Sequence, residues 1–232
     1  MLILATKSPR RKQLLGTIGW DFISISPEID EQVIRGESPE EYTKRVARAK
    51  AQAANNQPGV RWTKGDLILA ADTAVIDPGR GRNSEGERNQ MILGKPTSVG
   101  EAEEMLIRLR GRTHQVCTSI TVLDPVGGTI REATEFSTIK MRNYTLDEMN
   151  EYISSCDPFD KAGGYAIQHP TFQPVQKVNG CYPNVVGLPV CQVVRLAAEF
   201  GHNQINKEKE SCNKSDIPCW VYRRAFQGGR ID

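Results

Sequence analysis

Long apolar runs, signal-peptide features and clustered histidines are all absent from this sequence. No stretch approaches the ~20 consecutive apolar residues that a membrane-spanning helix needs. The opening apolar run stops at Ala5 and is followed by Lys7 rather than by a small-residue cleavage site, so we expect no signal peptide. The three histidines, His114, His169 and His202, are too far apart for an H-E-x-x-H zinc site. The sequence therefore predicts neither a membrane protein nor a histidine-based zinc enzyme.

An excess of charge of one sign is also missing. The 30 Lys+Arg residues nearly balance the 28 Asp+Glu residues, so a global attraction to nucleic acid or to a membrane is not supported. Any anion binding must therefore be local. The six cysteines form no C-x-x-C pair, and we expect reduced thiols of a cytoplasmic protein, most of them small core residues. A Cys212–Cys219 disulfide is the alternative for the tail.

Three common catalytic or nucleotide-binding motifs are missing as well. The segment 94–97 resembles the end of a Walker A loop, but Asn89 stands where the first glycine is needed and Pro96 breaks the pattern. No G-x-G-x-x-G motif follows a predicted strand, which argues against a dinucleotide-binding fold. No G-x-S-x-G nucleophile elbow is present, which argues against a serine hydrolase.

The most informative stretch is the N-terminal one. Residues 2–5 are apolar and predict a buried strand, while Ser8-Pro9 is typical of a helix N-cap followed by proline at the first helical position. A strand that runs into a helix N-terminus makes an anion site, because free N–H groups and the positive end of the helix dipole point outward. Arg10 and Arg11 add two guanidinium groups suited to phosphate oxygens. A basic first turn that is merely solvated is the alternative interpretation.

Strand and helix patterns alternate through the first half of the chain, and a hairpin follows. Strands are expected over 2–5, 21–25, 66–71, 74–76, 114–123 and 128–141. Helices are expected over 9–18, 39–55, 98–110 and 145–155, with a last one ending near residue 200; Ser38, Ser98 and Thr145 begin capping-box patterns. This order predicts a mixed α/β protein with a central twisted mixed sheet flanked by helices.

Charged and amide side chains recur at strand ends and glycine turns, where ligands gather in α/β sheets. They are Glu31, Lys50, Asp72, Lys95, Asp160, Lys161 and Gln168. Asp72 is the best candidate for chemistry, because a carboxylate inside an apolar run is costly to bury unless something pairs with it. Each residue taken alone is more often structural or solvated. The set of carboxylates and lysines suits Mg²⁺ or Mn²⁺ bridging a nucleotide phosphate, and so suggests hydrolysis by a metal-activated water.

Five segments, taken in order, resemble the motifs of a known family. They are Ala5-Thr6-Lys7-Ser8-Pro9-Arg10-Arg11, Ala71-Asp72-Thr73, Gly94-Lys95-Pro96, Asp160-Lys161-Ala162-Gly163-Gly164-Tyr165-Ala166-Ile167-Gln168 and Asn184-Val185-Val186-Gly187-Leu188-Pro189. The sequence is similar in these segments to the Maf proteins, which are nucleoside triphosphate pyrophosphatases related in fold to inosine triphosphate pyrophosphatase. The resemblance runs from residue 1 to about 201. It implies two lobes around a cleft, a domain over 1–202 and a homodimer, and leaves an insertion at 80–91 and an extension of unknown role at 203–232.

The resemblance also implies a role for each matched side chain. Asp72 would accept the proton of the attacking water and form an acidic centre with Glu31, and Lys50 is implied both in catalysis and in holding the triphosphate. Glu31 and Asp72 would also hold the Mg²⁺ or Mn²⁺ ion. The residues implied in triphosphate binding are Ser8, Arg10, Arg11 and Lys95, and those implied in substrate specificity are Arg10, Thr73 and Gln168.

The expected substrates are dTTP and UTP, and possible modified forms of these pyrimidine nucleotides, cleaved at the α-phosphorus to monophosphate and pyrophosphate. The amide of Gln168 suits this choice, because it can both donate to and accept from a uracil-like edge. Two alternatives remain open. One is a nucleotide-binding regulator of cell division, which would need the phosphate contacts but not the carboxylate pair Glu31 and Asp72. The other is a nucleic-acid-binding protein, which would rest only on the local basic segment 108–112.

Overall fold

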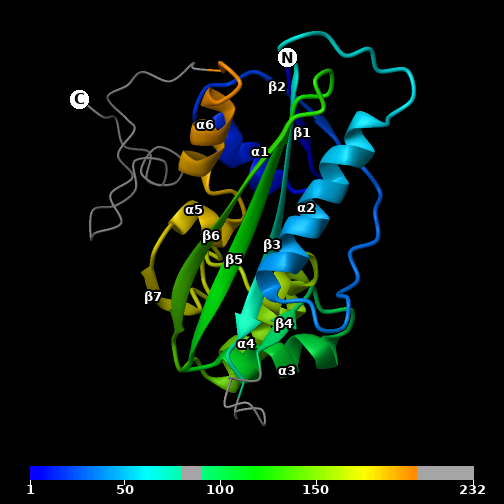
Figure 1. Ribbon diagram of the computed structural model, residues 1–232. Coiled ribbons are helices and arrows are strands. Elements are labelled where there is room, and N and C mark those ends of the chain that lie inside the picture. The colour runs from blue at the N-terminus through cyan, green and yellow to red at the C-terminus, as the bar shows by residue number, and fades with distance from the viewer. Residues whose placement is uncertain (80–89, 203–232) are drawn as a thin grey trace, which may run out of the picture. The chain divides into compact units, whose positions relative to one another are not determined.

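The computed structural model describes residues 1–79 and 90–202 as a mixed α/β fold (Figure 1). The strands are β1 (Leu2–Ala5), β2 (Phe22–Ile25), β3 (Leu67–Asp77), β4 (Met91–Leu93), β5 (Thr113–Leu123), β6 (Ile130–Met141) and β7 (Val175–Asn179). The helices are α1 (Pro9–Gly16), α2 (Pro39–Asn55), α3 (Val99–Leu109), α4 (Leu146–Ser154), α5 (Tyr182–Val186) and α6 (Val190–Ala198), with 3-10 turns η1 (Asp157–Asp160) and η2 (Ala162–Gly164). The predicted fold class is confirmed.

The strands form one mixed sheet in the order β2-β1-β3-β5-β6-β7, with β4 paired to β3. Strand β1 runs parallel to both β2 and β3, and Ala5 pairs with Ile25 on one side and with Ala70 on the other. Strands β4 and β7 are antiparallel to β3 and β6. The carboxyl end of β1 therefore lies beside Ala70, and β3 continues beyond this point through Asp72 to Asp77.

The chain divides into two compact units. The first comprises residues 1–72, 118–135 and the segment from Cys181 onward, and the second comprises 73–117 and 136–180. Strands β3, β5 and β6 each contribute residues to both units. No helix within 1–79 and 90–202 is long and apolar enough to cross a membrane.

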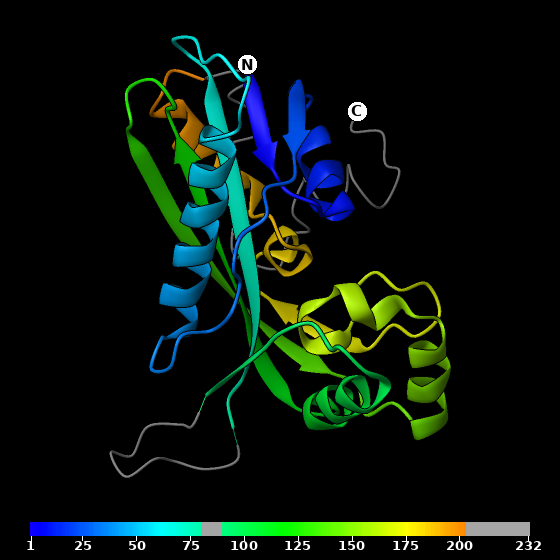
Figure 2. The ribbon, with the colours of Figure 1, turned by 90° about the vertical axis from the view of Figure 1, so that its right-hand side faces the viewer.

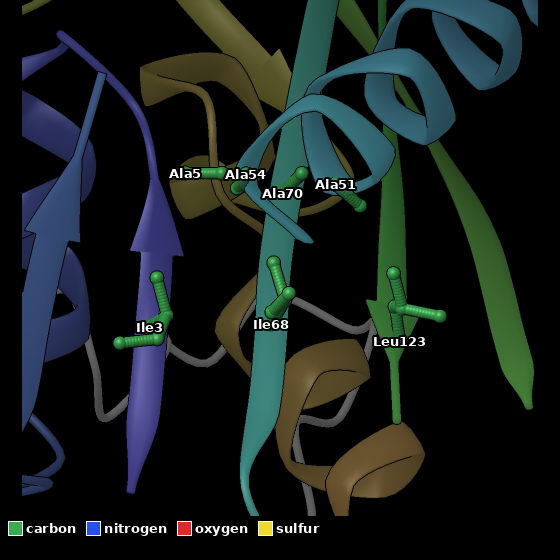
Figure 3. Packing of buried hydrophobic residues seen from close by; sticks show 7 residues of the cluster. All are labelled: Ile3, Ala5, Ala51, Ala54, Ile68, Ala70 and Leu123. Atoms are coloured by element: carbon green, nitrogen blue, oxygen red, sulfur yellow. The ribbon is translucent and has the colours of Figure 1, made fainter. Parts of the chain in front are cut away.

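The core of the first unit lies between α2 and the sheet. Its members are Ile3 and Ala5 of β1, Ile68 and Ala70 of β3, Leu123 of β5, and Ala51 and Ala54 of α2 (Figure 3). All of them are at most 4% exposed. Four of the seven are alanines, so the helix backbone packs close to the strands, and the side chains that follow along this face of α2 and β3 lie within reach of one another.

In the second unit, α3 lies beside α4 (Figure 2). Tyr152 of α4 stacks on Phe172 with ring centroids 4.4 Å apart, and Tyr144 packs on the same phenylalanine at 4.8 Å. The paired glycines make the close approach that their sequence predicts. A Cβ on Gly163 would lie 2.9 Å from Val75 Cγ1, and its N–H donates to the carbonyl of Gly94 at 2.9 Å.

The helix caps follow the sequence in two of three cases. Ser38 and Thr145 each form a complete capping box with the glutamate three residues later. Ser98 accepts from the N–H of Glu101, but the Glu101 carboxylate accepts from Thr97 N and Oγ1 instead of closing the box. The sequence pattern alone does not show which donor the glutamate side chain will bind, because Thr97 offers a competing hydroxyl next to the cap.

Several sequence expectations differ from the structure. The first helix stops at Gly16, and β3 runs unbroken through Asp72 to Asp77. The expected last helix is α6, whereas the short helix α5 before it, which ends at Gly187 in a left-handed conformation (φ 117°), was not expected. Strands β4 and β7 were not expected, since both are short and β7 is mostly polar. Among the described cysteines only Cys117 is buried, so the expectation of mostly core cysteines is wrong; Cys212 and Cys219 lie outside the described residues.

Candidate active site

Lys50 is the cation at the centre of the candidate site. It follows Val46 by one turn on α2 and lies just before Ala51, so its stem shares the apolar face of the helix. The side chain is only 10% exposed, and its ammonium contacts Asp72 Oδ1 at 2.7 Å and Glu31 Oε1 at 2.9 Å. The sequence placed Lys50 at the margin of this face, and the structure buries it there with two carboxylates.

Asp72 extends the face of β3 that carries Ile68 and Ala70, because alternate residues of a strand share a side. It is 5% exposed. Its Oδ1 accepts from Lys50, while its Oδ2 is buried with no hydrogen-bond partner among the described residues. Burial raises the pKa of Asp72, although the charges of Lys50 and Arg11 oppose the shift, and Glu31 adds to it. Such an atom is a ready proton acceptor in an otherwise apolar strand.

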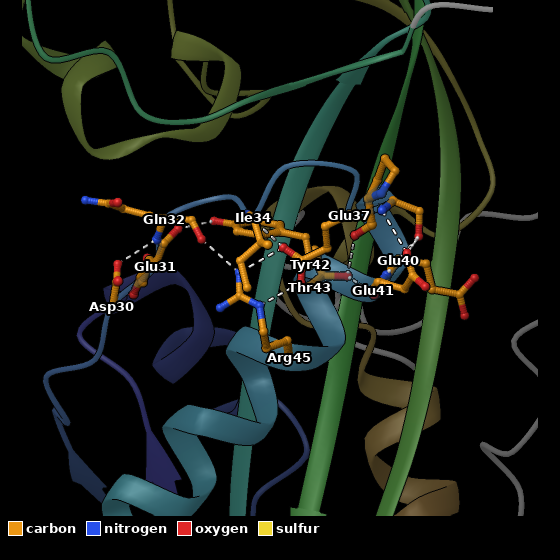
Figure 4. A network of polar contacts seen from close by, with 12 residues as sticks. Asp30, Glu31, Gln32, Ile34, Glu37, Glu40, Glu41, Tyr42, Thr43 and Arg45 are labelled. Carbon is orange, nitrogen blue, oxygen red and sulfur yellow. Dashed lines mark hydrogen bonds and ion pairs between the residues drawn. The ribbon is translucent and has the colours of Figure 1, made fainter. Parts of the chain in front are cut away.

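Glu31 comes from the irregular segment between β2 and α2. Its side chain is 42% exposed, in contrast to the buried Asp72. Polar side chains of α2 hold this segment, and Tyr42 Oη donates to the carbonyl of Glu31 at 3.0 Å (Figure 4). One partner of Lys50 is thus fixed in the sheet, whereas the other is carried by a surface loop.

The turn after β1 brings α1 to the same edge of the sheet. Thr6 N–H donates to Ile25 O at 2.8 Å, and the hydroxyls of Ser24 and Ser26 donate to Thr6 O. The N–H of Ser8 donates to Thr6 Oγ1 at 3.1 Å. Ser8 is the N-cap of α1 but makes no side-chain capping hydrogen bond. Backbone groups and neighbouring hydroxyls therefore fix the conformation of the turn, and the Ser8 hydroxyl is not used for capping.

Arg11 reaches from α1 toward this cluster of charges. Its Nε donates to the carbonyl of Gly187 at 2.8 Å, which fixes the direction of the guanidinium. Burial lowers the pKa of Arg11, the charges of Asp72 and Glu31 raise it, and Arg10 lowers it again. The forked guanidinium is a group suited to the oxygens of an anion.

Of the four remaining predicted site residues, Arg10 is half-buried in the first turn of α1 and belongs to the first unit, and the other three belong to the second. Thr73 follows Asp72 on β3 with its side chain on the opposite face, and Lys95 is exposed in the turn after β4. Gln168 lies in the segment after η2, and Tyr152 fixes this segment. The Tyr152 hydroxyl accepts from Ala166 N at 3.0 Å and donates to Asp157 Oδ2 at 2.9 Å.

Asp160 and Lys161, noted in the sequence as candidates, are part of this support. The Lys161 ammonium donates to Asp157 Oδ1 at 2.7 Å and to Asp160 Oδ1 at 2.5 Å. Lys161 is 7% exposed, so both of its partners compensate a buried charge. The pair thus holds the chain before Gln168.

Glu31 and Asp72 are the residues that could hold a divalent cation. Within 1–79 and 90–202 no three His, Cys, Asp or Glu side chains form a metal-binding group by themselves. Mg²⁺ commonly uses only one or two carboxylates and takes its remaining ligands from phosphate oxygens and water. Two carboxylates around one ammonium, with the buried Asp72 Oδ2 unbonded, fit that pattern.

The structure thus brings together Glu31, Lys50 and Asp72 as the sequence predicted, with Arg11 in the same field of charge. Sequence reasoning missed the hydroxyl of Tyr42, which it assigned to the apolar face of α2, and the carbonyl of Gly187. Nothing in a residue pattern reports where a backbone carbonyl points. The tyrosine could have been suspected, since a core residue with a polar tip needs a partner.

A mixed α/β fold with a strand-to-helix turn, arginines and a lysine–carboxylate cluster is an arrangement suited to a phosphate-bearing ligand. The family model described as Maf-like protein matches residues 1–200. The chain belongs to the Maf-like protein family.

Individual relatives agree with this assignment. A dTTP/UTP pyrophosphatase of Dehalococcoides mccartyi is 42% identical over 203 residues, which cover 87% of this chain and 83% of that protein. One from Geotalea uraniireducens is 39% identical over 201 residues (86% and 95%). One from Syntrophomonas wolfei is 36% identical over 205 residues (88% and 100%). The similarity covers nearly all of each relative, so it extends well beyond the five short motifs.

Proposed function

We propose that this protein is a nucleoside triphosphate pyrophosphatase that hydrolyses dTTP and UTP to the monophosphate and pyrophosphate. The observation that carries the proposal is the buried, unbonded Oδ2 of Asp72 next to a lysine-bound Oδ1. Burial raises the pKa of Asp72, which makes this carboxylate a better proton acceptor than an exposed aspartate. The names of the relatives support the choice of substrates.

In the proposed reaction, Asp72 takes a proton from a water molecule whose oxygen attacks the α-phosphorus. The new bond joins that oxygen to the α-phosphorus, and the bond from the α-phosphorus to the bridging oxygen of the β-phosphate breaks. Pyrophosphate leaves with the bonding electron pair. A divalent cation held by Glu31 and Asp72 would supply neutralising charge and a more acidic water.

The cations of the chain have separate parts in this proposal. The ammonium of Lys50 binds the carboxylates of both Glu31 and Asp72 and reduces the repulsion between them. Ser8, Arg10, Arg11 and Lys95 bind the triphosphate oxygens, and Arg10, Thr73 and Gln168 choose the base. Forked guanidinium donors suit the phosphate oxygens, and charge that builds up during transfer is then stabilised by groups already in position.

The proposal is tested by the identity of the products in water labelled with heavy oxygen. We expect dTTP and UTP to give monophosphate and pyrophosphate with the label in the monophosphate, and CTP and 7-methyl-GTP to react more slowly. Release of orthophosphate and a diphosphate, or label in the pyrophosphate, would contradict attack at the α-phosphorus. Tight nucleotide binding without turnover at any Mg²⁺ or Mn²⁺ concentration would favour a nucleotide-binding regulator instead.

We also propose a homodimer in the cytoplasm, where nucleoside triphosphates are made and used. Family resemblance in the sequence supports the dimer. Light scattering of the purified protein tests it, and a monomer at working concentration would refute it. Cell fractionation tests the location.

A further inference from the structure

The segment that carries Glu31 is an exposed loop with an unusual amount of support. Residues 30–36 have no helix or strand assignment and are all exposed. Ordering such a chain costs conformational entropy, so a carboxylate on it would ordinarily sample many positions. Glu31 nevertheless lies 2.9 Å from the buried ammonium of Lys50. Some interaction must therefore restrict the loop.

Two side chains of α2 provide that restriction (Figure 4). Tyr42 Oη donates to the carbonyl of Glu31 at 3.0 Å, and Arg45 Nη2 donates to the carbonyl of Gln32 at 2.8 Å. Arg45 also binds Glu37 through Nε (2.6 Å) and Nη2 (2.9 Å), and Glu37 Oε2 accepts from Ile34 N at 3.2 Å. One guanidinium thus holds both ends of the segment 32–37.

The two side chains also support each other. The guanidinium carbon of Arg45 lies 5.7 Å from the centre of the Tyr42 ring, within the range of a cation–π contact. Both residues lie on the helix that carries Lys50, so the loop is fastened to the same rigid element as the partner of its carboxylate. An anchor on that helix sets the distance from Glu31 to Lys50.

We propose that Arg45, together with Tyr42, is a positioning residue that sets Glu31 against Lys50 and so controls the rate of the reaction. The inference rests on the function proposed above. Arg45 touches neither carboxylate of the cluster in the contacts described. It acts through the backbone of Gln32 and the carboxylate of Glu37.

Arg48 gives a matched control on the same helix. Its Nε and Nη2 bind the carboxylate of Glu132 at 3.1 and 2.5 Å, so it also forms a two-pronged ion pair, but it makes no described contact with the 30–37 segment. We expect Arg45→Gln to lower kcat for dTTP about tenfold with little change in KM. Arg48→Gln should leave kcat unchanged. Equal kcat values for the two variants would overturn the proposal.

A double-mutant cycle separates positioning from a general effect on structure. If Arg45 acts through Glu31, then Arg45→Gln lowers kcat in the wild-type background and changes it little once Glu31→Gln is present. The same fold-loss in both backgrounds would mean that Arg45 acts elsewhere. Tyr42→Phe, which keeps the ring and removes the donor, should give a smaller loss of the same kind. Arg45→Lys should restore only part of the activity, because an ammonium cannot bind both partners as a fork.

Amide hydrogen exchange gives a readout that does not depend on turnover. Exchange at residues 31–36 should be faster in Arg45→Gln and unchanged in Arg48→Gln, with both variants folded as judged by circular dichroism. Unchanged exchange in Arg45→Gln would overturn the inference even if the enzyme is active. If the wild-type protein does not hydrolyse dTTP or UTP, the proposed function fails, while the exchange comparison still decides whether Arg45 orders the loop.

Discussion

Asp72 and Asp77 lie on the same strand and are both buried, at 5% and 1% exposure, yet their surroundings have opposite effects. Asp77 uses both oxygens: Arg108 Nε donates to Oδ2 at 2.8 Å, and Oδ1 accepts from Gly79 N at 3.1 Å and contacts Arg112 at 3.2 Å. Burial alone would raise the pKa of Asp77, but these donors outweigh it and lower the pKa. Asp72 has one bonded oxygen and a raised pKa.

The comparison shows that burial of a carboxylate is not a sign of function by itself. A carboxylate whose oxygens are all hydrogen-bonded stabilises the fold. A buried carboxylate oxygen without a hydrogen bond is unfavourable, so binding a ligand or a proton there is favoured. Asp72 belongs to the first unit and Asp77 to the second. Two arginines contact the oxygens of Asp77, whereas Lys50 contacts only one oxygen of Asp72.

The largest expected effect is on catalysis. Asp72→Asn should lower kcat for dTTP about 10³-fold, because the amide cannot take the proton from water. The free energy of unfolding should fall by less than in Asp77→Asn, because Lys50 keeps Glu31 as a charge partner and an asparagine oxygen can still accept from its ammonium. Steady-state kinetics and urea unfolding of the same preparation measure both quantities, and full activity in this variant would contradict the role of Asp72.

The opposite outcome is expected for the second aspartate. Asp77→Asn should lower the free energy of unfolding by about 3 kcal/mol, because it removes the buried carboxylate that two partly buried arginines share, and among the described contacts only Arg108 keeps another carboxylate, that of Glu104. The kcat per folded molecule should stay near that of the wild type at low temperature. A loss of stability no larger than that of a surface substitution would show that the two aspartates do not differ as described.

A pH effect is expected from His114, which is buried beside Tyr165 with its Nε2 2.8 Å from the tyrosine oxygen. Burial lowers the pKa of His114 from 6.5 to about 4, so the unfolded chain takes up a proton between these values that the folded one does not. Stability is therefore lost as the pH falls through this range, by about 2 kcal/mol between pH 7 and pH 5. His114→Gln should unfold with a weaker pH dependence; an unchanged dependence would assign the effect to other groups.

The smallest effect on stability is expected at a helix cap. Ser8→Ala should change the free energy of unfolding by less than about 0.5 kcal/mol, since its hydroxyl caps nothing. Ser38→Ala should cost about 1 kcal/mol, because it breaks a complete capping box. Only Ser8→Ala should raise the KM for dTTP. Thermal unfolding and kinetics on the two variants distinguish a serine that stabilises a helix from one reserved for phosphate.

The sequence predicted most of the fold in outline, but not the contrast between the two aspartates. The alternating strands and helices, the Ser38 and Thr145 caps and the chemical importance of Asp72 follow from local patterns, which act over a few residues. The contrast between Asp72 and Asp77 does not, because it depends on Arg108 and Arg112, which reach Asp77 from a distant part of the chain. The support of Glu31 by Tyr42 and Arg45 was missed for a related reason: side-chain contacts with backbone carbonyls leave no periodic signal.

The alanines between α2 and the sheet have a consequence for mutational tolerance. Ala51 follows Lys50 in the sequence, and Ala70 lies two residues before Asp72, on the same face of β3 (Figure 3). A larger side chain at either position would push the helix outward, and the 2.7 Å contact from Lys50 to Asp72 would lengthen first. The two alanines thus set the distance between Lys50 and Asp72. In a library of variants selected for folding alone, larger residues would be accepted at positions 51 and 70. Selection for turnover would retain alanine at both.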